Sequence, residues 1–145
     1  MGFQPAGLAR RLAAIFLDSL VLGSLIFIAA QPLPLIPEDL QSQPLIRLLK
    51  QIYLLSIAWL YFGWFWTHGG QTVGMRAWRI KVIAEDGSAL DWGQATRRYL
   101  AAILSWLPAG LGYWWSLFDS DKRAWHDSLS RSRLLVLPKA PKRRK

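Results

Sequence analysis

The strongest constraint on the fold is an apolar run near the start of the chain. Residues 12–30 follow Arg10 and Arg11 directly and carry one charge, that of Asp18. A helix needs about 20 apolar residues to cross a hydrocarbon core of roughly 30 Å. The run therefore predicts a membrane-spanning helix within Ala9–Ala30. A carboxylate inside such a helix costs on the order of 3 kcal/mol and normally faces protein or a water-filled cavity, so Asp18 is the leading functional candidate.

Arg11 and Asp18 lie on one face of this helix. They are seven residues apart, so they are separated by two turns, or roughly 10 Å along the axis. That distance is too great for a direct ion pair. We therefore expect each of the two side chains to have a partner elsewhere.

Composition favours a membrane protein. The 145 residues are 52% hydrophobic, include nine tryptophans and carry a formal charge of +9. The charge alone would suit nucleic-acid binding, but the long uncharged stretches need a membrane or a larger core than this chain offers. Cysteine is absent, which excludes disulfides and thiolate metal sites. The first run is interrupted by Asp18 and lacks a small-x-small cleavage pattern, so we expect a retained helix.

A second helix is expected after a proline-rich loop. Residues 31–43 contain three prolines and two acids, which predicts a non-helical loop, and Pro44 suits the first turn of a helix. This helix runs over Leu45–Thr67, with Arg47 and Lys50 snorkelling to lengthen a short uncharged part. Its aromatic end, W-L-Y-F-G-W-F-W, is interpreted as an anchor at the headgroup boundary rather than a binding box.

Strand patterns follow the second helix. Arg76–Ala84 alternates with period two, which predicts a strand, and Glu85–Ser88 contains an Asp-Gly turn signal. A return strand is possible over Ala89–Trp92. Arg131–Leu137 is also strand-like, and pairing between these segments is expected.

The third apolar segment, Tyr99–Phe118, allows two interpretations. It is uncharged over its whole length, but Pro108, Gly110 and Gly112 interrupt its centre and weaken a straight helix. A third span gives a poor distribution of Lys and Arg. A segment that re-enters the same face gives 16 basic residues inside and 2 outside, as the positive-inside bias requires. We predict the re-entrant or interfacial hairpin, with both termini cytoplasmic.

An ordered set of motifs resembles the RDD family of small membrane proteins. The set comprises R-x6-D in the first helix, G-Q-T-V-G before the basic strand, a proline-interrupted apolar segment, and H-D-S-L before the last strand. The family's arginine falls on Arg11, and its two aspartates fall on Asp18 and Asp127. Met75 stands where a lysine is usual, and Ser130-Arg131-Ser132 replaces a run of small residues.

The resemblance implies one membrane domain over residues 6–137, followed by a basic tail over 138–145. It also implies a suspected transport role for unidentified ligands. Two helices are too few to enclose a pathway, so transport calls for a homo-oligomer or a membrane partner. The alternative is a non-catalytic scaffold or accessory subunit.

The candidate site residues each carry two hypotheses. Asp18 is either a proton- or cation-binding carboxylate, or a packing group hydrogen-bonded to Ser24, Ser56 or a neighbouring chain. Arg11 either binds lipid phosphate or meets Asp127 when the third segment folds back.

Other chemistry finds little support in the sequence. His126-Asp127 lacks the further ligands that a catalytic metal needs, and phosphate-loop and hydrolase motifs are absent, so no metal, cofactor or enzymatic activity is expected. The tail K-A-P-K-R-R-K is expected to bind anionic lipid rather than nucleic acid. The sequence thus predicts an all-α protein of the cell (inner or plasma) membrane with two transmembrane helices, the third apolar segment and a small cytoplasmic β element.

Overall fold

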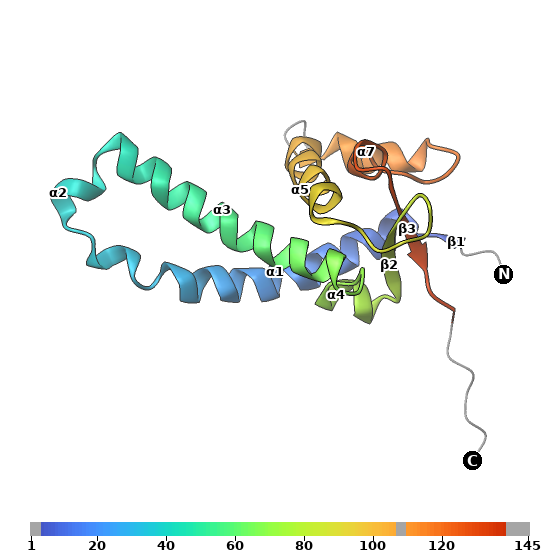
Figure 1. Ribbon diagram of the computed structural model, residues 1–145, viewed down its shortest axis with the longest axis horizontal. Coiled ribbons are helices and arrows are strands. Elements are labelled where there is room, and N and C mark those ends of the chain that lie inside the picture. The colour runs from blue at the N-terminus through green and yellow to red at the C-terminus, as the bar shows by residue number, and fades with distance from the viewer. Residues whose placement is uncertain (1–3, 107–109, 139–145) are drawn as a thin grey trace, which may run out of the picture.

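A long helical hairpin dominates the computed structural model, which describes residues 4–106 and 110–138 (Figure 1). Its two arms are α1 (Leu8–Ala30) and α3 (Pro44–Thr67). The connection contains two short helices, η1 (Leu33–Leu35) and α2 (Glu38–Gln41). Both long helices predicted from the sequence are confirmed.

The apolar side chains on the outer part of the hairpin are exposed. Among the described residues, α1 with the turn after it and α3 are the two helices long and apolar enough to cross a membrane, and only 11% of each apolar window is buried. Large side chains such as Phe16, Phe27 and Leu55 are more than half exposed. A soluble protein rarely exposes so large an apolar surface, so these faces are suited to lipid.

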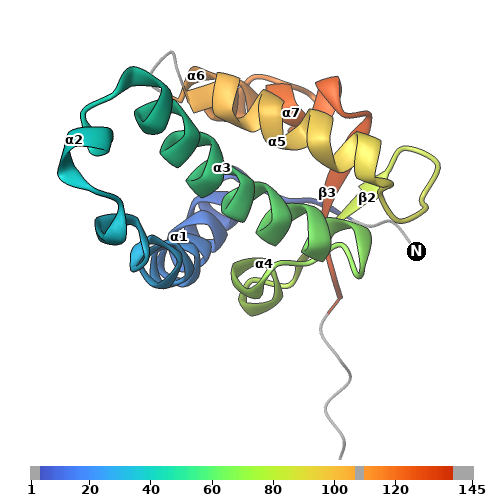
Figure 2. The same ribbon diagram turned by 60° about the vertical axis from the view of Figure 1, so that its left-hand side comes forward.

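The remaining elements gather at the base of the hairpin (Figures 1 and 2). There α3 packs against both α1 and α5. The buried residues of α1 are Arg11, Ala14 and Asp18, all in the half that reaches the base. The elements at the base are β1 (Gln4–Pro5), α4 (Val73–Ala77), β2 (Ile80–Ala84), α5 (Trp92–Trp106), α6 (Leu111–Trp114), η2 (Trp115–Leu117), α7 (Trp125–Leu129) and β3 (Ser132–Val136).

A small antiparallel sheet closes the base. The strand order is β1-β3-β2, and β2 pairs with β3 from Ile80 opposite Val136 to Ala84 opposite Ser132. The pairing expected between the two strand-like segments is therefore confirmed. The side chains of Ile80, Val82 and Leu134 are buried and form part of the apolar core.

The predicted start of the first strand at Arg76 is wrong, because α4 occupies residues 73–77. Thr72 caps this helix by accepting a hydrogen bond from the N–H of Met75 at 3.2 Å, as Thr commonly does at a helix start. The strand begins only at Ile80. Alternation over residues 76–79 was therefore too short to outweigh a capped helical turn.

The possible return strand over Ala89–Trp92 is also wrong. Asp91 accepts a hydrogen bond from the N–H of Gln94 at 2.7 Å, and the Gln94 side chain accepts one from the N–H of Asp91 at 3.1 Å. This reciprocal pair is a capping box. It starts α5 at Trp92, seven residues before the uncharged segment begins.

The third apolar segment is not one continuous helix. α5 ends at Trp106, and the chain resumes at Gly110, whose φ of 77° is left-handed, before α6 and η2. Pro108, the residue expected to break the segment, lies outside the described residues, as does the basic run 139–145. Re-entry of this segment into the membrane stays a prediction.

A candidate functional site at the base of the hairpin

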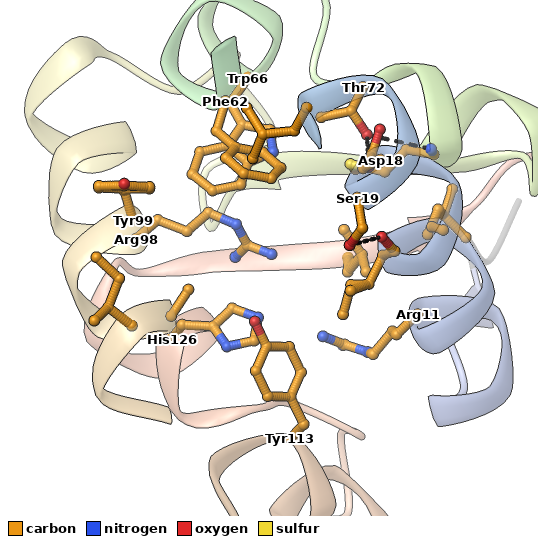
Figure 3. A pocket seen from close by; sticks show the side chains of 18 residues that line it. Arg11, Asp18, Ser19, Phe62, Trp66, Thr72, Arg98, Tyr99, Tyr113 and His126 are labelled. Atoms are coloured by element: carbon orange, nitrogen blue, oxygen red, sulfur yellow. Dashed lines mark hydrogen bonds between the residues drawn. The ribbon is translucent and has the colours of Figure 1, made fainter. Parts of the chain in front are cut away.

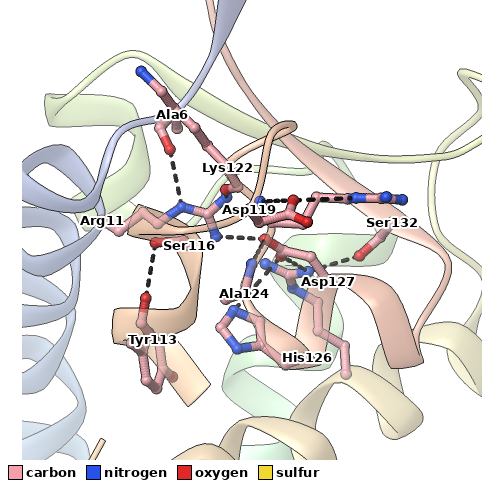
Figure 4. A network of polar contacts seen from close by, with 12 residues as sticks. Ala6, Arg11, Tyr113, Ser116, Asp119, Lys122, Ala124, His126, Asp127 and Ser132 are labelled. Carbon is pink, nitrogen blue, oxygen red and sulfur yellow. Dashed lines mark hydrogen bonds and ion pairs between the residues drawn. The ribbon is translucent and has the colours of Figure 1, made fainter. Parts of the chain in front are cut away.

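Asp127 joins two arginines that come from distant parts of the chain (Figure 4). Its Oδ2 accepts from Nη1 of Arg11 at 2.5 Å, and its Oδ1 accepts from Nη1 of Arg98 at 2.6 Å. The carboxylate is fully buried, and each arginine is 3% exposed. The backbone N–H of Ala124 donates a third hydrogen bond at 3.0 Å. The expected contact between Arg11 and Asp127 is therefore present.

Arg11 makes further contacts that fix the start of α1. Its Nε donates to the carbonyl of Ala6 at 3.0 Å, and its Nη2 donates to the carbonyl of Lys122 at 2.8 Å. The guanidinium thus links the segment before α1 to the loop before α7. Arg11 is therefore buried among groups of its own chain. The hypothesis that it binds lipid phosphate at the membrane boundary would need an exposed guanidinium, which the structure does not have.

The charge state of this cluster follows from its burial. Burial alone would raise the pKa of Asp127, but the guanidinium groups of Arg98 and Arg11 and the N–H of Ala124 hold that pKa well below its ordinary value. Burial lowers the pKa of the neighbouring His126 to about 3, because the effect of burial is larger than the opposing effect of the Asp127 carboxylate, which raises that pKa. At neutral pH the cluster therefore contains two cations, one anion and a neutral imidazole, a net charge of +1.

Asp18 lies in a separate polar group, two turns after Arg11 and near the middle of α1. One carboxylate oxygen accepts from the Tyr61 hydroxyl at 2.9 Å and from the N–H of Gly74 at 2.8 Å, and the other accepts from the Thr72 hydroxyl. Asp18 is 4% exposed. Its donors come from α3, α4 and the turn before α4, so the carboxylate ties these elements to α1.

Ser24 and Ser56, the two partners within the chain that the sequence suggested for Asp18, are wrong. The hydroxyls of Ser24 and Ser56 instead donate to carbonyls one turn earlier in their own helices, those of Leu20 and Ile52. A helical serine commonly bonds back in this way. Two of the three observed partners, Thr72 and Gly74, belong to the motif G-Q-T-V-G, so this motif was the sequence feature that could have indicated them.

A cavity of about 300 Å³ connects the two polar groups (Figure 3). Arg11 and Asp18 line it from α1, Arg98 from α5 and His126 from α7. Most of the remaining wall is apolar, and Ile15, Leu22 and Ile103 contribute to it. The structure therefore places Arg11 and Asp18 on one cavity but brings only Arg11 into contact with Asp127.

Arg98 is the site residue that sequence reasoning missed. It follows Arg97 at the edge of an uncharged segment, where a basic pair has the composition of an interfacial anchor. The two arginines differ only in the face of α5 on which they lie, because Arg97 is exposed while Arg98 is buried. The available signal was the helical spacing, which places Arg98 on the same face of α5 as Ala95 and Ala102.

No cluster of three or more His, Cys, Asp or Glu side chains suited to a metal ion occurs among residues 4–106 and 110–138. The site is instead a set of buried charges beside an apolar cavity, at the foot of two exposed apolar helices. Together these features define a small helical membrane protein.

The comparison with protein families identifies this membrane protein further. The model of the RDD family matches residues 5–131, and the chain belongs to this family. It is also similar to the uncharacterized protein YxaI of Bacillus subtilis (strain 168), with 26% identity covering 91% of this chain and 97% of that protein. No solved structure matches the chain.

Proposed function

We propose that the protein transports a small solute or ion across the membrane, with Asp18 as a proton- or cation-binding group. The observation that carries the proposal is the cavity beside α1, because a buried carboxylate and two buried arginines line it. Ionisable groups within a membrane helix are costly, and they commonly mark ion or substrate pathways.

The surroundings of Asp18 are compatible with exchange of a small cation. Two of its three donors are hydroxyls, those of Tyr61 and Thr72. A hydroxyl both donates and accepts, so each can turn a lone pair toward a bound cation. Hard cations prefer oxygen ligands of this kind. A proton bound to Asp18 would be shared with the same hydroxyl oxygens.

Transport by this chain requires more than one copy or a membrane partner. The hairpin contributes two apolar helices, and two helices do not enclose a pathway. The low burial of these two helices supports assembly with other chains, since long faces of α1 and α3 are available to pack against a second copy or a membrane partner. We propose a homo-oligomer in the cell (inner or plasma) membrane, which performs binding and transport rather than catalysis.

Flux in reconstituted vesicles tests this function. A pH-sensitive dye inside the vesicles reports proton movement when a gradient of Na⁺, K⁺ or Li⁺ is imposed. We expect the wild type to couple one of these gradients to proton movement and Asp18→Asn to lose at least nine-tenths of the rate. Asp39→Asn, which alters an exposed acid in α2, is the matched control. Absence of wild-type flux with all three cations would count against ion-coupled transport.

A scaffold or accessory role is the second candidate. Asp18 is already satisfied by three donors of its own chain, one of them the backbone N–H of Gly74, and this favours a structural carboxylate. In that case Asp18→Asn should abolish assembly, measured by the mass of the protein–detergent complex. Loss of flux with normal assembly favours transport, and retention of both would remove Asp18 from either role.

The sheet supports the proposed topology. It joins β1 before the first span, β2 after the second and β3 after the third apolar segment. Strands that pair in water lie on one side of the membrane, so a re-entrant third segment fits this sheet. We propose that this side is cytoplasmic and that residues 139–145, outside the described structure, bind anionic lipid.

A further inference from the structure

Three buried nitrogen atoms on the cavity wall have no hydrogen-bond partner among the described residues. They are Nε1 of Trp66, Nε of Arg98 and Nδ1 of His126. These residues are 7%, 3% and 5% exposed, and all three line the same cavity. Figure 3 shows them approaching this space from different elements, with the guanidinium of Arg98 between Trp66 and His126.

The chemistry of these atoms indicates which kind of ligand fits. The nitrogens of Trp66 and Arg98 are donors that cannot accept. A buried donor without an acceptor costs about 1–3 kcal/mol, so two on one cavity favour a ligand with acceptor oxygens. Arg98 also keeps its ring contact with Trp66, at 5.2 Å from its guanidinium carbon to the ring centroid, which brings the two donors to one region.

The local charge selects an anion. Arg11 and Arg98 share one carboxylate, that of Asp127, so the cluster that these three residues form beside the cavity has a net charge of +1. The other acid on the wall, Asp18, lies two turns away along α1, roughly 10 Å, and already accepts three hydrogen bonds. An anion bound beside Arg98 therefore lies next to a cluster in which two arginine charges exceed the single negative charge of Asp127.

The rest of the wall selects an amphiphile. Ile15 and Leu22 of α1 and Ala102 and Ile103 of α5 line the cavity. α1 is a candidate membrane span, and Ile103 is 38% exposed. The volume of about 300 Å³ equals roughly ten water molecules at about 30 Å³ each. This volume is large enough for a small head group, and a chain attached to such a group would have to continue outward along α1 and α5.

We propose that this cavity binds the anionic head group of a membrane amphiphile, a phosphate or carboxylate attached to an apolar chain. The N–H groups of Trp66 and Arg98 donate to its oxygens, and the apolar wall holds the first part of its chain. Binding of this kind requires no transport, so it stands apart from the function proposed above.

Lipid binding to the purified full-length protein in detergent tests the site. Native mass spectrometry would compare phosphatidylglycerol, phosphatidylcholine and inorganic phosphate. Trp66→Phe keeps an aromatic ring and removes one donor to a charged acceptor, a loss that corresponds to about a tenfold or greater weakening. Trp59→Phe is the matched control, because the Nε1 of Trp59 donates to Thr96 at 3.0 Å and Trp59 does not line the cavity.

A second pair of variants tests the cavity without altering its donors. Ala102→Phe places a ring in the cavity and should displace the lipid, whereas Leu100→Phe alters an exposed position of the same helix. We expect phosphatidylglycerol to bind the wild type and both control variants within twofold of one another. Trp66→Phe and Ala102→Phe should each lose at least tenfold.

Three results would overturn the proposal. Equal binding of phosphatidylcholine would remove the selection for net negative charge. Inorganic phosphate that binds as tightly as the lipid, and with the same dependence on Trp66, would identify a site for soluble anions. Unchanged lipid binding by both Trp66→Phe and Ala102→Phe would place the lipid elsewhere on the protein.

Discussion

Asp127 is the residue whose charge holds the base together. It receives Arg11 from α1 and Arg98 from α5, and both arginines are buried. Removing one member of a buried ionic group commonly costs about 3–5 kcal/mol, because the remaining charges lose compensation. We expect Asp127→Asn to lower the unfolding free energy in detergent by that amount, measured by urea denaturation.

The matched control for this change is Asp121→Asn. Asp121 is 64% exposed and lies 3.2 Å from Arg123. Exposed ion pairs contribute roughly 0–1 kcal/mol, so the control should change stability by less than about 1 kcal/mol. Equal effects of the two substitutions would mean that the buried cluster contributes no more than a surface pair.

His126 makes stability depend on pH. Its pKa falls from 6.5 to about 3 in the folded protein, so between these values the unfolded chain binds a proton that the folded protein does not. Stability therefore decreases as the pH falls through this range, by up to tenfold in the folding equilibrium constant per pH unit. The depressed pKa of Asp127 adds a further loss of stability below about pH 4.

Unfolding midpoints measured between pH 7 and 4.5 check this dependence. His126→Asn should flatten the curve in that range, while His68→Asn, which alters an exposed histidine, should leave the slope of the wild type in place. A wild-type midpoint that is constant from pH 7 to 4.5 would contradict a buried neutral imidazole.

At the residue scale, the sequence predicted the buried charges better than their partners. Asp18 and Arg11 were recognisable because a charge within or beside an apolar run needs a reason. The side chains that bind them lie 43 to 116 positions away along the chain, and no local pattern encodes such a distance. Arg98 escaped notice because composition does not distinguish the buried member of an arginine pair from the exposed one.

Among the elements, α4 depends on a close approach to α1. A Cβ atom added at Gly74 would collide with the carbonyl oxygen of Ala14 and lie 2.9 Å from Cγ of Asp18. The colliding atom is backbone, so it cannot rotate away. We expect Gly74→Ala to lower stability by about 1–3 kcal/mol, the usual range for overpacking, and to weaken the contacts of Asp18.

Gly69→Ala is the control for this glycine. It lies in the turn before α4, and an added Cβ there meets nothing within 4 Å. Urea denaturation of both variants should separate a steric effect at Gly74 from a general loss of backbone freedom. If the two alanines have equal effects, the packing of α4 on α1 is not tight.

The elements that the sequence predicted are those with a long, uninterrupted pattern. α1 and α3 have more than 20 residues each, and the β2–β3 pair has five residues in each strand with alternating burial. The errors fell on short stretches where a cap decided the outcome. Thr72 turned the predicted start of a strand into α4, and Asp91 with Gln94 turned a predicted return strand into the start of α5.

For the whole molecule, the sheet constrains how the chain can lie in a membrane. β1, β2 and β3 are separated in sequence by the helical hairpin and by the third apolar segment, yet they form one sheet. Asp127 adds a second tie, since it binds side chains from α1 and α5. A third segment that crossed the bilayer would separate β3 and α7 from the partners they contact.

Single cysteines test this arrangement, and the chain has no cysteine of its own. Ser42, Ser88 and Ser120 are exposed and lie, respectively, between the two spans, after β2 and after η2. With an impermeant thiol reagent on intact cells, we expect labelling at Ser42→Cys alone, because the sheet keeps the other two on one side of the membrane, the side that we propose is cytoplasmic. Permeabilised cells, in which all three should react, provide the control. Labelling of Ser120→Cys from outside without Ser88→Cys would mean that the third segment spans, and then neither the β2–β3 pairing nor the Arg11–Asp127 contact could form.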